Sequence, residues 1–274
     1  MRVNVLGFIT AFFFSLISPA LAVSDNPAVL GMPRIGPAYG APPRSYHDSK
    51  VVIITFKTSP DVLQKLVPKP MVPNKEGIIT LYFGHFEAPA YDRGSFHFPG
   101  ESYEETGLVA PVSLFKEGGG YSLFLYLNKV APAISGREIW GFPKKDADIV
   151  MTEKEGKITF NVNRLGVPIV KATFKKTAKV ENIPARPARA RYNLKYIPSA
   201  TKDGPPDVMQ IVSYKQETKI KELYNGEASL ELGSTPVDPL GEIPIAKIIK
   251  AEYLVVDGGV DYGGVLYDYL KERK

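Results

Sequence analysis

The chain contains no cysteine and only three histidines. Without cysteine it forms neither disulfides nor thiolate metal sites, and thiol catalysis is excluded. His47, His85 and His97 are far apart in the sequence and lack the i, i+4 spacing of a helical metal site. No serine stands in a nucleophile-elbow pattern. The sequence therefore disfavours metal-dependent and serine-hydrolase chemistry, and we expect neither a metal nor a cofactor.

Long hydrophobic runs are missing beyond the first residues. The apolar stretch Val5–Ile17 is shorter than the roughly 20 residues that a membrane-spanning helix needs. Arg2 precedes it, and the small residues Ala20-Leu21-Ala22 follow it. This order is typical of a secretory signal peptide. We predict a signal peptide at 1–22 and a mature chain that begins near Val23, is exported to the periplasm or secreted, and keeps no stable membrane anchor. An uncleaved anchor is the alternative.

A strong charge of one sign is also absent. The net charge is +5 over the whole chain, which is mild for this length, and we expect no nucleic-acid partner. Basic residues concentrate between Lys171 and Arg191, where strand and Pro-rich loop alternate. This spacing favours a solvated face or a subunit contact, and attraction of an anionic ligand is the alternative.

Short β-rich runs separated by turn residues make up most of the remaining sequence. They are Val51–Phe56, Ile78–Phe83, Tyr121–Leu127, Ile149–Thr152, Ile158–Val162, Ile169–Phe174, Tyr192–Ile197, Val208–Ser213 and Ala251–Val256. Their close spacing favours antiparallel pairing, and Glu155-Gly156 marks a hairpin between two of them. Proline and glycine before the first run predict an extended arm over 23–45. No linker divides 46–274, so we expect a single domain there.

Three short helices are expected. Ser59 can cap the first with its hydroxyl, and Pro60 fits its first position, since proline needs no hydrogen-bond donor there. Pro132 opens a second helix that runs through Ile139, and Val265–Leu270 forms a third. The predicted fold class is α+β. It is mostly antiparallel sheet, curled into a closed barrel-like core that hides its edges, with a few short helices.

The most informative segment runs from Gly136 to Lys145. Pro143 holds the residue before it extended, so the second helix must end there and Lys144-Lys145 stand at the mouth of the strand that begins near Asp146. A lysine pair before an acidic residue is most often a solvated turn. Here the apolar residues that lead up to Pro143 can desolvate one ammonium, and a charged amine in a dry pocket loses its proton more readily.

This segment resembles one in the acetoacetate decarboxylases, where Gly-Arg-Glu is followed by an aromatic residue, a proline and two lysines. Further stretches are similar to that family in the same order: Leu66-Val67-Pro68, Ala110-Pro111-Val112-Ser113, Tyr192-Asn193-Leu194-Lys195 and Tyr267-Asp268-Tyr269-Leu270-Lys271. The resemblance covers most of the chain after about Tyr46. It implies the family's fold, a Schiff base on the first lysine, here Lys144, and a homo-oligomer.

The family also carries an acidic pocket residue a few positions before the Pro-Val-Ser stretch. By spacing it falls on Glu105, with Glu104 as the alternative. The chain departs from the family at two places. A family arginine near the start of the first core strand falls on Ser49, and Lys50 replaces it only if the strand is bulged. A second family carboxylate falls near Tyr82. These changes bear on the substrate more than on the lysine chemistry.

The reactive amine must be neutral. A free lysine has a pKa of about 10.4, so fewer than one amine in about a thousand is neutral at pH 7. Acetoacetate decarboxylases are themselves the known example in which burial and a neighbouring ammonium lower this pKa. Because neighbours on a regular strand point to opposite faces, Lys144 and Lys145 cannot both enter one pocket. We expect burial to act on Lys144, and Lys145 to assist mainly through structure or ion pairing.

The resemblance implies decarboxylation of acetoacetate or a similar small-molecule β-keto acid to a ketone and carbon dioxide. Lys144 would form the Schiff base, Glu105 would orient the substrate or move a proton, and Lys145 would support them. Two alternatives stay open. One is a Schiff-base aldolase-dehydratase that acts on a larger keto acid, and the other is a non-enzymatic periplasmic barrel that binds small ligands.

Overall fold

The computed structural model describes residues 32–33, 37–93, 96–186 and 190–271. The expected signal peptide at 1–22 lies outside these residues, as does the first part of the expected arm. Tyr39 and Ala41, in the described part of the arm, are buried. The last residues of the arm therefore pack against the domain, whose first strand begins at Arg44.

Strands dominate the described chain. In chain order they are β1 (Arg44–Lys57), β2 (Val72–Pro73), β3 (Ile78–Ala88), β4 (Tyr91–Arg93), β5 (Phe96–Phe98), β6 (Glu101–Leu114), β7 (Glu117–Leu127), β8 (Lys144–Asp146), β9 (Asp148–Lys154), β10 (Lys157–Arg164), β11 (Val167–Lys179), β12 (Ala190–Ile197), β13 (Val208–Leu232) and β14 (Lys247–Asp268). The helical elements are α1 (Pro60–Leu66), α2 (Val130–Ser135), the π-helical segment η2 (Gly136–Trp140) and the 3-10 turn η3 (Leu240–Glu242).

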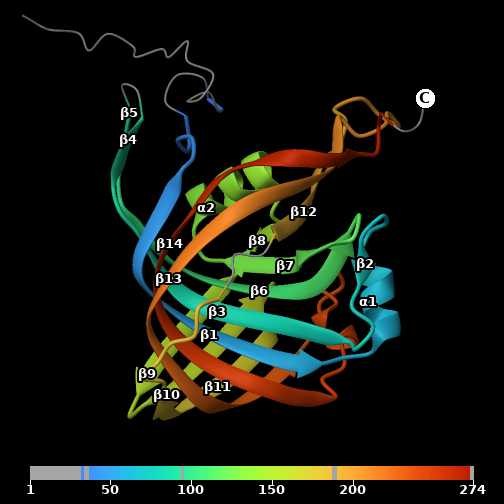
Figure 1. Ribbon diagram of the computed structural model, residues 1–274. Helices are drawn as coiled ribbons and strands as arrows, with labels where there is room; N and C mark the ends of the chain where they lie inside the picture. The colour runs from blue at the N-terminus through green and yellow to red at the C-terminus, as the bar shows by residue number, and fades with distance from the viewer. Residues whose placement is uncertain (1–31, 34–36, 94–95, 187–189, 272–274) are drawn as a thin grey trace, which may run out of the picture.

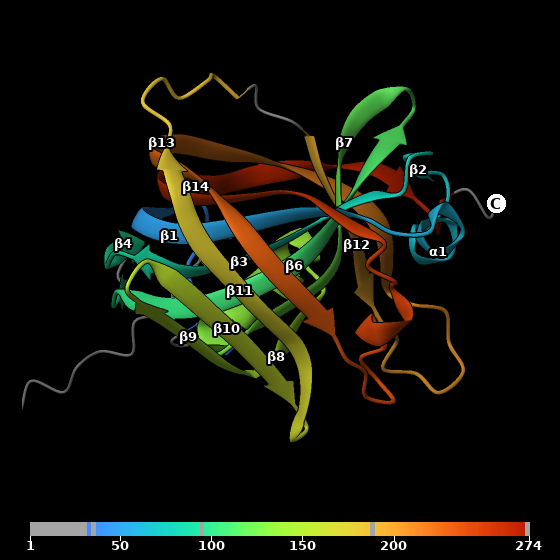
Figure 2. The same ribbon diagram turned by 90° about the horizontal axis from the view of Figure 1, so that it is seen from below.

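One large sheet contains all of these strands except β4 and β5. Its order is β12-β7-β6-β3-β1-β14-β13-β11-β10-β9, and all neighbours are antiparallel apart from β12 and β8, which each lie parallel to β7. β12 also pairs with β13, so the path from β12 through β7, β6, β3, β1 and β14 to β13 returns to its start. Figures 1 and 2 show the resulting curled sheet, with α1 at its rim beside β2. The predicted fold class is confirmed.

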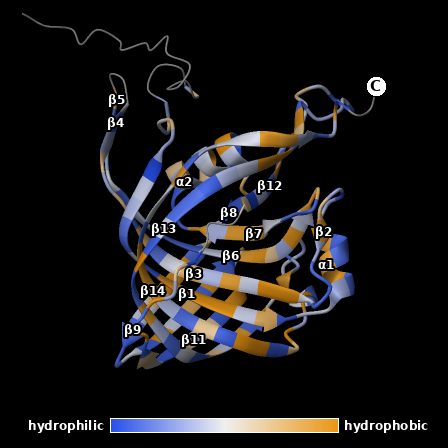
Figure 3. Cartoon of the chain, viewed as in Figure 1, coloured by the Kyte–Doolittle hydropathy of each residue, from blue (hydrophilic) through white to orange (hydrophobic). Residues whose placement is uncertain are grey.

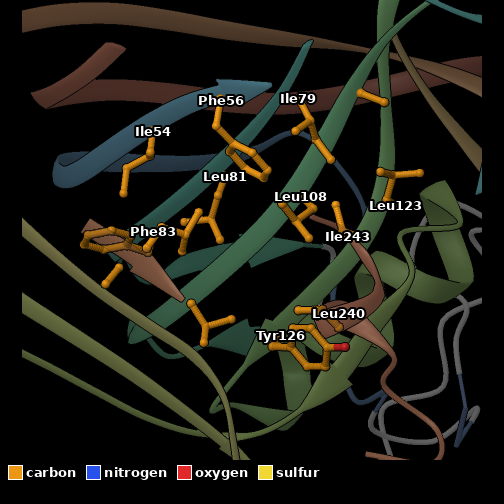
Figure 4. Packing of buried hydrophobic residues seen from close by; sticks show 14 of the residues in the cluster. Ile54, Phe56, Ile79, Leu81, Phe83, Leu108, Leu123, Tyr126, Leu240 and Ile243 are labelled. Atoms are coloured by element: carbon orange, nitrogen blue, oxygen red, sulfur yellow. The ribbon is translucent and has the colours of Figure 1, made fainter. Parts of the chain in front are cut away.

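Alternating side chains explain how the sheet forms its main core. In β1 the residues Val52, Ile54 and Phe56 are fully buried on one face. The hydropathy colouring shows the same alternation along neighbouring strands (Figure 3). Figure 4 shows Ile54 and Phe56 beside Leu81 and Phe83 of β3. Burying each such side chain contributes about 1.5–3 kcal/mol, and the cluster extends to β10 and β11.

The opposite face of the same strands carries a smaller buried cluster. It contains Tyr46, Val51 and Phe86, and the rings of Tyr82 and Tyr103 pack against it. Since residues alternate between faces, Tyr82 points away from its neighbours Leu81 and Phe83. We call the face of β3 and β6 that carries Tyr82, Tyr103 and Glu105 the site face.

The predicted elements were located well, with four corrections. All nine predicted runs lie in strands, but β2, β4, β5 and β6 were missed. Strands β13 and β14 are much longer than expected, at 25 and 22 residues. The third predicted helix is wrong, because Val265 to Asp268 continue β14 and pair with β13. Helix α1 begins at Pro60 as predicted, yet the Ser59 hydroxyl makes no capping hydrogen bond. The backbone carbonyl of Ser59 accepts from Val62 and Leu63 instead.

Candidate active site

A short helical approach places Lys144. Helix α2 passes directly into the π-helical segment η2, an irregularity that is frequent at functional sites. Gly141 ends the segment in a left-handed conformation (φ 69°), which suits glycine because it has no Cβ. The backbone amide of Phe142 donates to the carbonyl of Gly136, and Pro143 then directs the chain into β8. The second predicted helix is thus confirmed and ends before Pro143, but it begins at Val130, two residues before Pro132, and its last part is π-helical.

The Lys144 side chain lies on the site face and is only 8 % exposed. Its Nζ is 2.9 Å from Oε2 of Glu105 and donates to the carbonyl of Pro132 at 3.2 Å. The ring centroids of Phe142 and Tyr103 lie 5.2 and 5.9 Å from Nζ. An aromatic wall and one carboxylate therefore surround the amine.

Close packing against Gly136 fixes the path of this side chain. A Cβ at Gly136 would lie 2.8 Å from Cδ and 2.9 Å from Cε of Lys144. Both distances are shorter than real carbon contacts, so the lysine can follow this path only because residue 136 lacks a side chain. Arg137 adds a second restraint, since its Nη1 donates to the carbonyl of Lys144 at 3.0 Å.

Glu105 stands opposite the amine on β6. It pairs with Gly84 of β3 and Leu127 of β7, and its side chain is almost completely buried. The phenol of Tyr82 donates to Oε1 at 2.7 Å. Oε2 makes no hydrogen bond within the described residues and faces only Lys144. One carboxylate oxygen is thus held by a phenol, and the other is left to the amine.

The negative charge of Glu105 raises the pKa of four nearby phenols. Burial is the largest cause that raises the pKa of Tyr82, Tyr103, Tyr46 and Tyr214, and in each case the Glu105 charge adds to it. These phenols therefore stay protonated at neutral pH and can act as hydrogen-bond donors. The hydroxyl of Tyr46 accepts a hydrogen bond from the side-chain amide of Gln216, and Ser122 hydrogen-bonds to Tyr214.

Glu104, the alternative acidic residue, lies elsewhere. Its Oε1 is 2.9 Å from Nδ1 of His85, and its other oxygen accepts a short hydrogen bond from Asn128. His85 also contacts Glu87, which is exposed. Successive residues of β6 point to opposite faces, so only Glu105 shares the site face with Lys144.

Lys145 points away from Lys144, as strand alternation predicts. Its Nζ donates to Oδ1 of Asp238 at 2.8 Å and to the carbonyl of Val237 at 2.6 Å. Asp238 is fully buried beside the main core. The structure thus gives Lys145 an ion-pairing position, and its side chain does not enter the candidate site.

Neither Ser49 nor Lys50 of β1 brings a cation to the site at the place of the family arginine. Ser49, at the place of the family arginine, is fully buried, and its hydroxyl accepts from the backbone amide of Glu87. The pairing register of β1 does shift between His47 and Lys50, which is the bulge that would be needed. Lys50 is nevertheless exposed.

Several site residues escaped sequence reasoning. Tyr103, Tyr46, Tyr214 and Gln216 were not singled out, although Tyr103 and Glu105 have the i, i+2 spacing of one strand face. That signal was unused because β6 itself was not predicted. Tyr82, where a family carboxylate was expected, does contact Glu105. In the described part of the chain no group of three His, Cys, Asp or Glu side chains is arranged to hold a metal.

Comparison with known proteins now decides the family. Residues 31–270 match the family model for acetoacetate decarboxylase. The chain is 34% identical over 257 residues to acetoacetate decarboxylase of Burkholderia ambifaria, covering 92% of this chain and 100% of that protein. The chain belongs to the acetoacetate decarboxylase family. It is accordingly an enzyme of the acetoacetate decarboxylase type.

Solved structures agree with this assignment. The crystal structure of acetoacetate decarboxylase from Legionella pneumophila superposes with a TM-score of 0.75 at 29% identity, over 88% of this chain and 94% of that one. The enduracididine biosynthesis enzyme MppR, solved with the condensation product of pyruvate and imidazole 4-carboxaldehyde, gives a TM-score of 0.74 at 15% identity, over 90% and 99% of the two chains. This second likeness shows the fold alone.

Proposed function

We propose that this protein decarboxylates acetoacetate or a similar β-keto acid through a Schiff base on Lys144. The observation that carries the proposal is the buried amine of Lys144, which faces a single carboxylate between aromatic rings. An amine that is shielded from water and placed beside a proton acceptor is suited to attack a ketone.

The reaction begins with proton transfer from Lys144 and addition of its neutral amine to the ketone carbon. Loss of water gives an iminium, which attracts electrons. The bond to the carboxylate carbon then breaks, carbon dioxide leaves, and the bonding electrons form an enamine. A proton adds to the enamine carbon, and water hydrolyses the resulting imine to the ketone and free lysine. Overall, one keto acid anion and one proton give one ketone and carbon dioxide.

Glu105 is the group that moves the proton. Its Oε2 is within hydrogen-bonding distance of Nζ, which meets the geometric requirement for a general base. Tyr82 holds the other oxygen and so fixes the orientation of the carboxylate. Lys145 supports the site by anchoring β8 to Asp238.

A second candidate reaction also forms the imine but releases no carbon dioxide. An aldolase-dehydratase would use Lys144 on a larger keto acid, and the absence of an arginine at Ser49 favours this reaction. Analysis of the products from acetoacetate and from longer keto acids separates the two reactions.

The N-terminal pattern further supports an exported enzyme, and the family resemblance supports a homo-oligomer.

Borohydride trapping tests the proposal. Incubation with acetoacetate and borohydride should add one isopropyl group to the wild-type protein, and peptide mapping should place it on Lys144. The Lys144→Ala variant should gain no mass and should have no decarboxylase activity. Lys195 is the rival amine, because burial lowers its pKa. Labelling of Lys195, or an unlabelled wild-type protein, would overturn the proposal.

A further inference from the structure

Arg191 is a cation of the site face that the proposed reaction has not used. It lies on β12, directly opposite Tyr214 on β13 and beside Gly120 on β7. Residues opposite each other on paired strands project from the same face, so Arg191 and Tyr214 share one face. A Cβ on Gly120 would lie 2.8 Å from Nη1 of Arg191, which shows that the guanidinium lies over this glycine.

Aromatic contacts connect Arg191 to the amine. The ring of Tyr214 packs edge-on against Phe142 with centroids 4.8 Å apart, and Phe142 in turn lies 5.2 Å from Nζ of Lys144. The positive charge of Arg191 also acts to lower the pKa of both Tyr214 and Tyr46, against the effect of burial. Arg191 therefore affects two of the four phenols whose pKa the charge of Glu105 raises.

Within the part of the chain that the structure describes, no acidic side chain pairs with the guanidinium of Arg191. This side chain forms neither an ion pair nor a hydrogen bond with the described residues, and the residue is partly buried. Arg44 is the other cation whose charge reaches a phenol of the site, Tyr103, but its guanidinium stacks over the ring of Tyr91 at 4.5 Å. A partly buried guanidinium without a partner is a ready site for a carboxylate, which it can bind through two parallel hydrogen bonds.

We propose that Arg191 binds the carboxylate of the keto acid substrate. The inference rests on the proposed function, since it assumes that the ketone of the same molecule reacts at Lys144. It assigns to β12 the carboxylate recognition that is missing from β1, where Ser49 is neutral, Lys50 is exposed and the guanidinium of Arg44 stacks on Tyr91.

The test compares two ketones that leave the same adduct. Acetoacetate carries a carboxylate and acetone does not, yet borohydride converts either into one isopropyl group on Lys144. In the Arg191→Gln variant, the acetoacetate concentration for half-maximal labelling should rise about tenfold to a hundredfold, the loss expected for a charged two-point contact. The value for acetone should not change. Arg191→Lys keeps the charge without the planar fork and should give a smaller rise.

Arg44→Gln is the matched control, because it removes a guanidinium that is already engaged with Tyr91. It should leave the concentrations of acetoacetate and acetone for half-maximal labelling unchanged. The inference is overturned if Arg191→Gln shifts neither ketone, if it shifts both equally, or if Arg44→Gln reproduces the selective shift. Each of these results still shows labelled wild-type protein, so the proposed function would stand.

Failure of the proposed function would look different, since wild-type protein would not be labelled by either ketone. In that case calorimetry with propionate measures the contribution of Arg191 to carboxylate binding, because propionate carries a carboxylate but cannot form an imine. Binding to the wild type should weaken about tenfold or more in Arg191→Gln. Equal dissociation constants for the two proteins would sink the inference on this measurement as well.

Discussion

Lys144 and Lys145 are neighbours in sequence, but they lie in two different regions of the molecule. Each forms one close ion pair, Lys144 with Glu105 at 2.9 Å and Lys145 with Asp238 at 2.8 Å. Asp238 has further partners, because it also accepts from the hydroxyls of Thr235 and Tyr126. Glu105 accepts only from Tyr82 besides its contact with Lys144, among the residues that the structure describes.

The difference separates a structural ion pair from a reactive one. Both oxygens of Asp238 are engaged by donors, which is the condition under which a buried charge is stable. In the Lys144 pair, Oε2 of Glu105 makes no hydrogen bond with the described residues. The Lys144 side chain runs beside aromatic rings and over Gly136, where a Cβ would displace it. Similar distances therefore do not imply similar roles, and completeness of the hydrogen bonding is the more useful criterion.

Asp238→Ala should give the largest effect on stability. It leaves the ammonium of Lys145 without its carboxylate at the edge of the core. Breaking a buried pair costs about 3–5 kcal/mol, and we expect the low end of this range because the Lys145 side chain is one-third exposed. Urea unfolding should show this loss of unfolding free energy. A change below about 1 kcal/mol would mean that the Lys145 pair is not structural.

The pH dependence gives the control for Asp238. Burial acts to raise its pKa, but hydrogen bonds from Lys145, Thr235 and Tyr126 outweigh this and hold the pKa below its ordinary value of 3.8. Its contribution is therefore present above pH 3.8 and is lost as the pH falls through the pKa of the folded state. The gap between wild type and variant should shrink in this acid range.

Gly136→Ala should give the largest effect on activity without loss of the fold. Alanine suits the helical backbone at this position, but its Cβ would displace the Lys144 side chain. A misplacement of about 1 Å can reduce a rate by about 10²-fold, and we expect a fall in kcat/KM of this size. Gly118→Ala is the control, because a Cβ there meets nothing within 4 Å. Unchanged kcat/KM in Gly136→Ala would show that the lysine path is not restricted.

Tyr82→Phe should have the smallest of the three effects. It removes the one hydrogen bond to Oε1 of Glu105 while keeping the ring. A hydrogen bond to a charged group is worth about 1.5–3 kcal/mol, and we expect kcat/KM to fall about tenfold, at the low end of this range. Tyr196→Phe, at an exposed phenol, should leave it unchanged. If the two variants behave alike, Tyr82 does not orient the carboxylate.

Sequence reasoning reached the residues that are close together in the chain. The helix, Pro143 and the lysine pair form one local motif, so the placement of Lys144 and the opposite direction of Lys145 could be predicted from local backbone rules. Glu105 was chosen over Glu104 by family spacing, and the alternation of β6 gives the physical reason. Local rules could not place residues whose position depends on the pairing of strands that are far apart in the sequence.

Strand β6 was missed because its residues do not alternate clearly between apolar and polar, and Pro111 weakens the strand pattern further. The end of β14 was predicted as a helix because Val265 to Leu270 form a short apolar run, for which local preference is ambiguous. Long-range pairing with β13 decided that segment. Arg191 appeared only as part of a basic stretch, since its neighbours Gly120 and Tyr214 are far away in sequence.

The indole of Trp140 donates to the backbone carbonyl of Asp261 at 2.8 Å, which ties η2 to β14. The segment that delivers Lys144 is therefore fastened by one of the last parts of the chain to be synthesised. A nascent or truncated polypeptide that stops before residue 261 lacks this fastening. We therefore expect Lys144 to take its final position beside Glu105 only after this late part of the chain has folded.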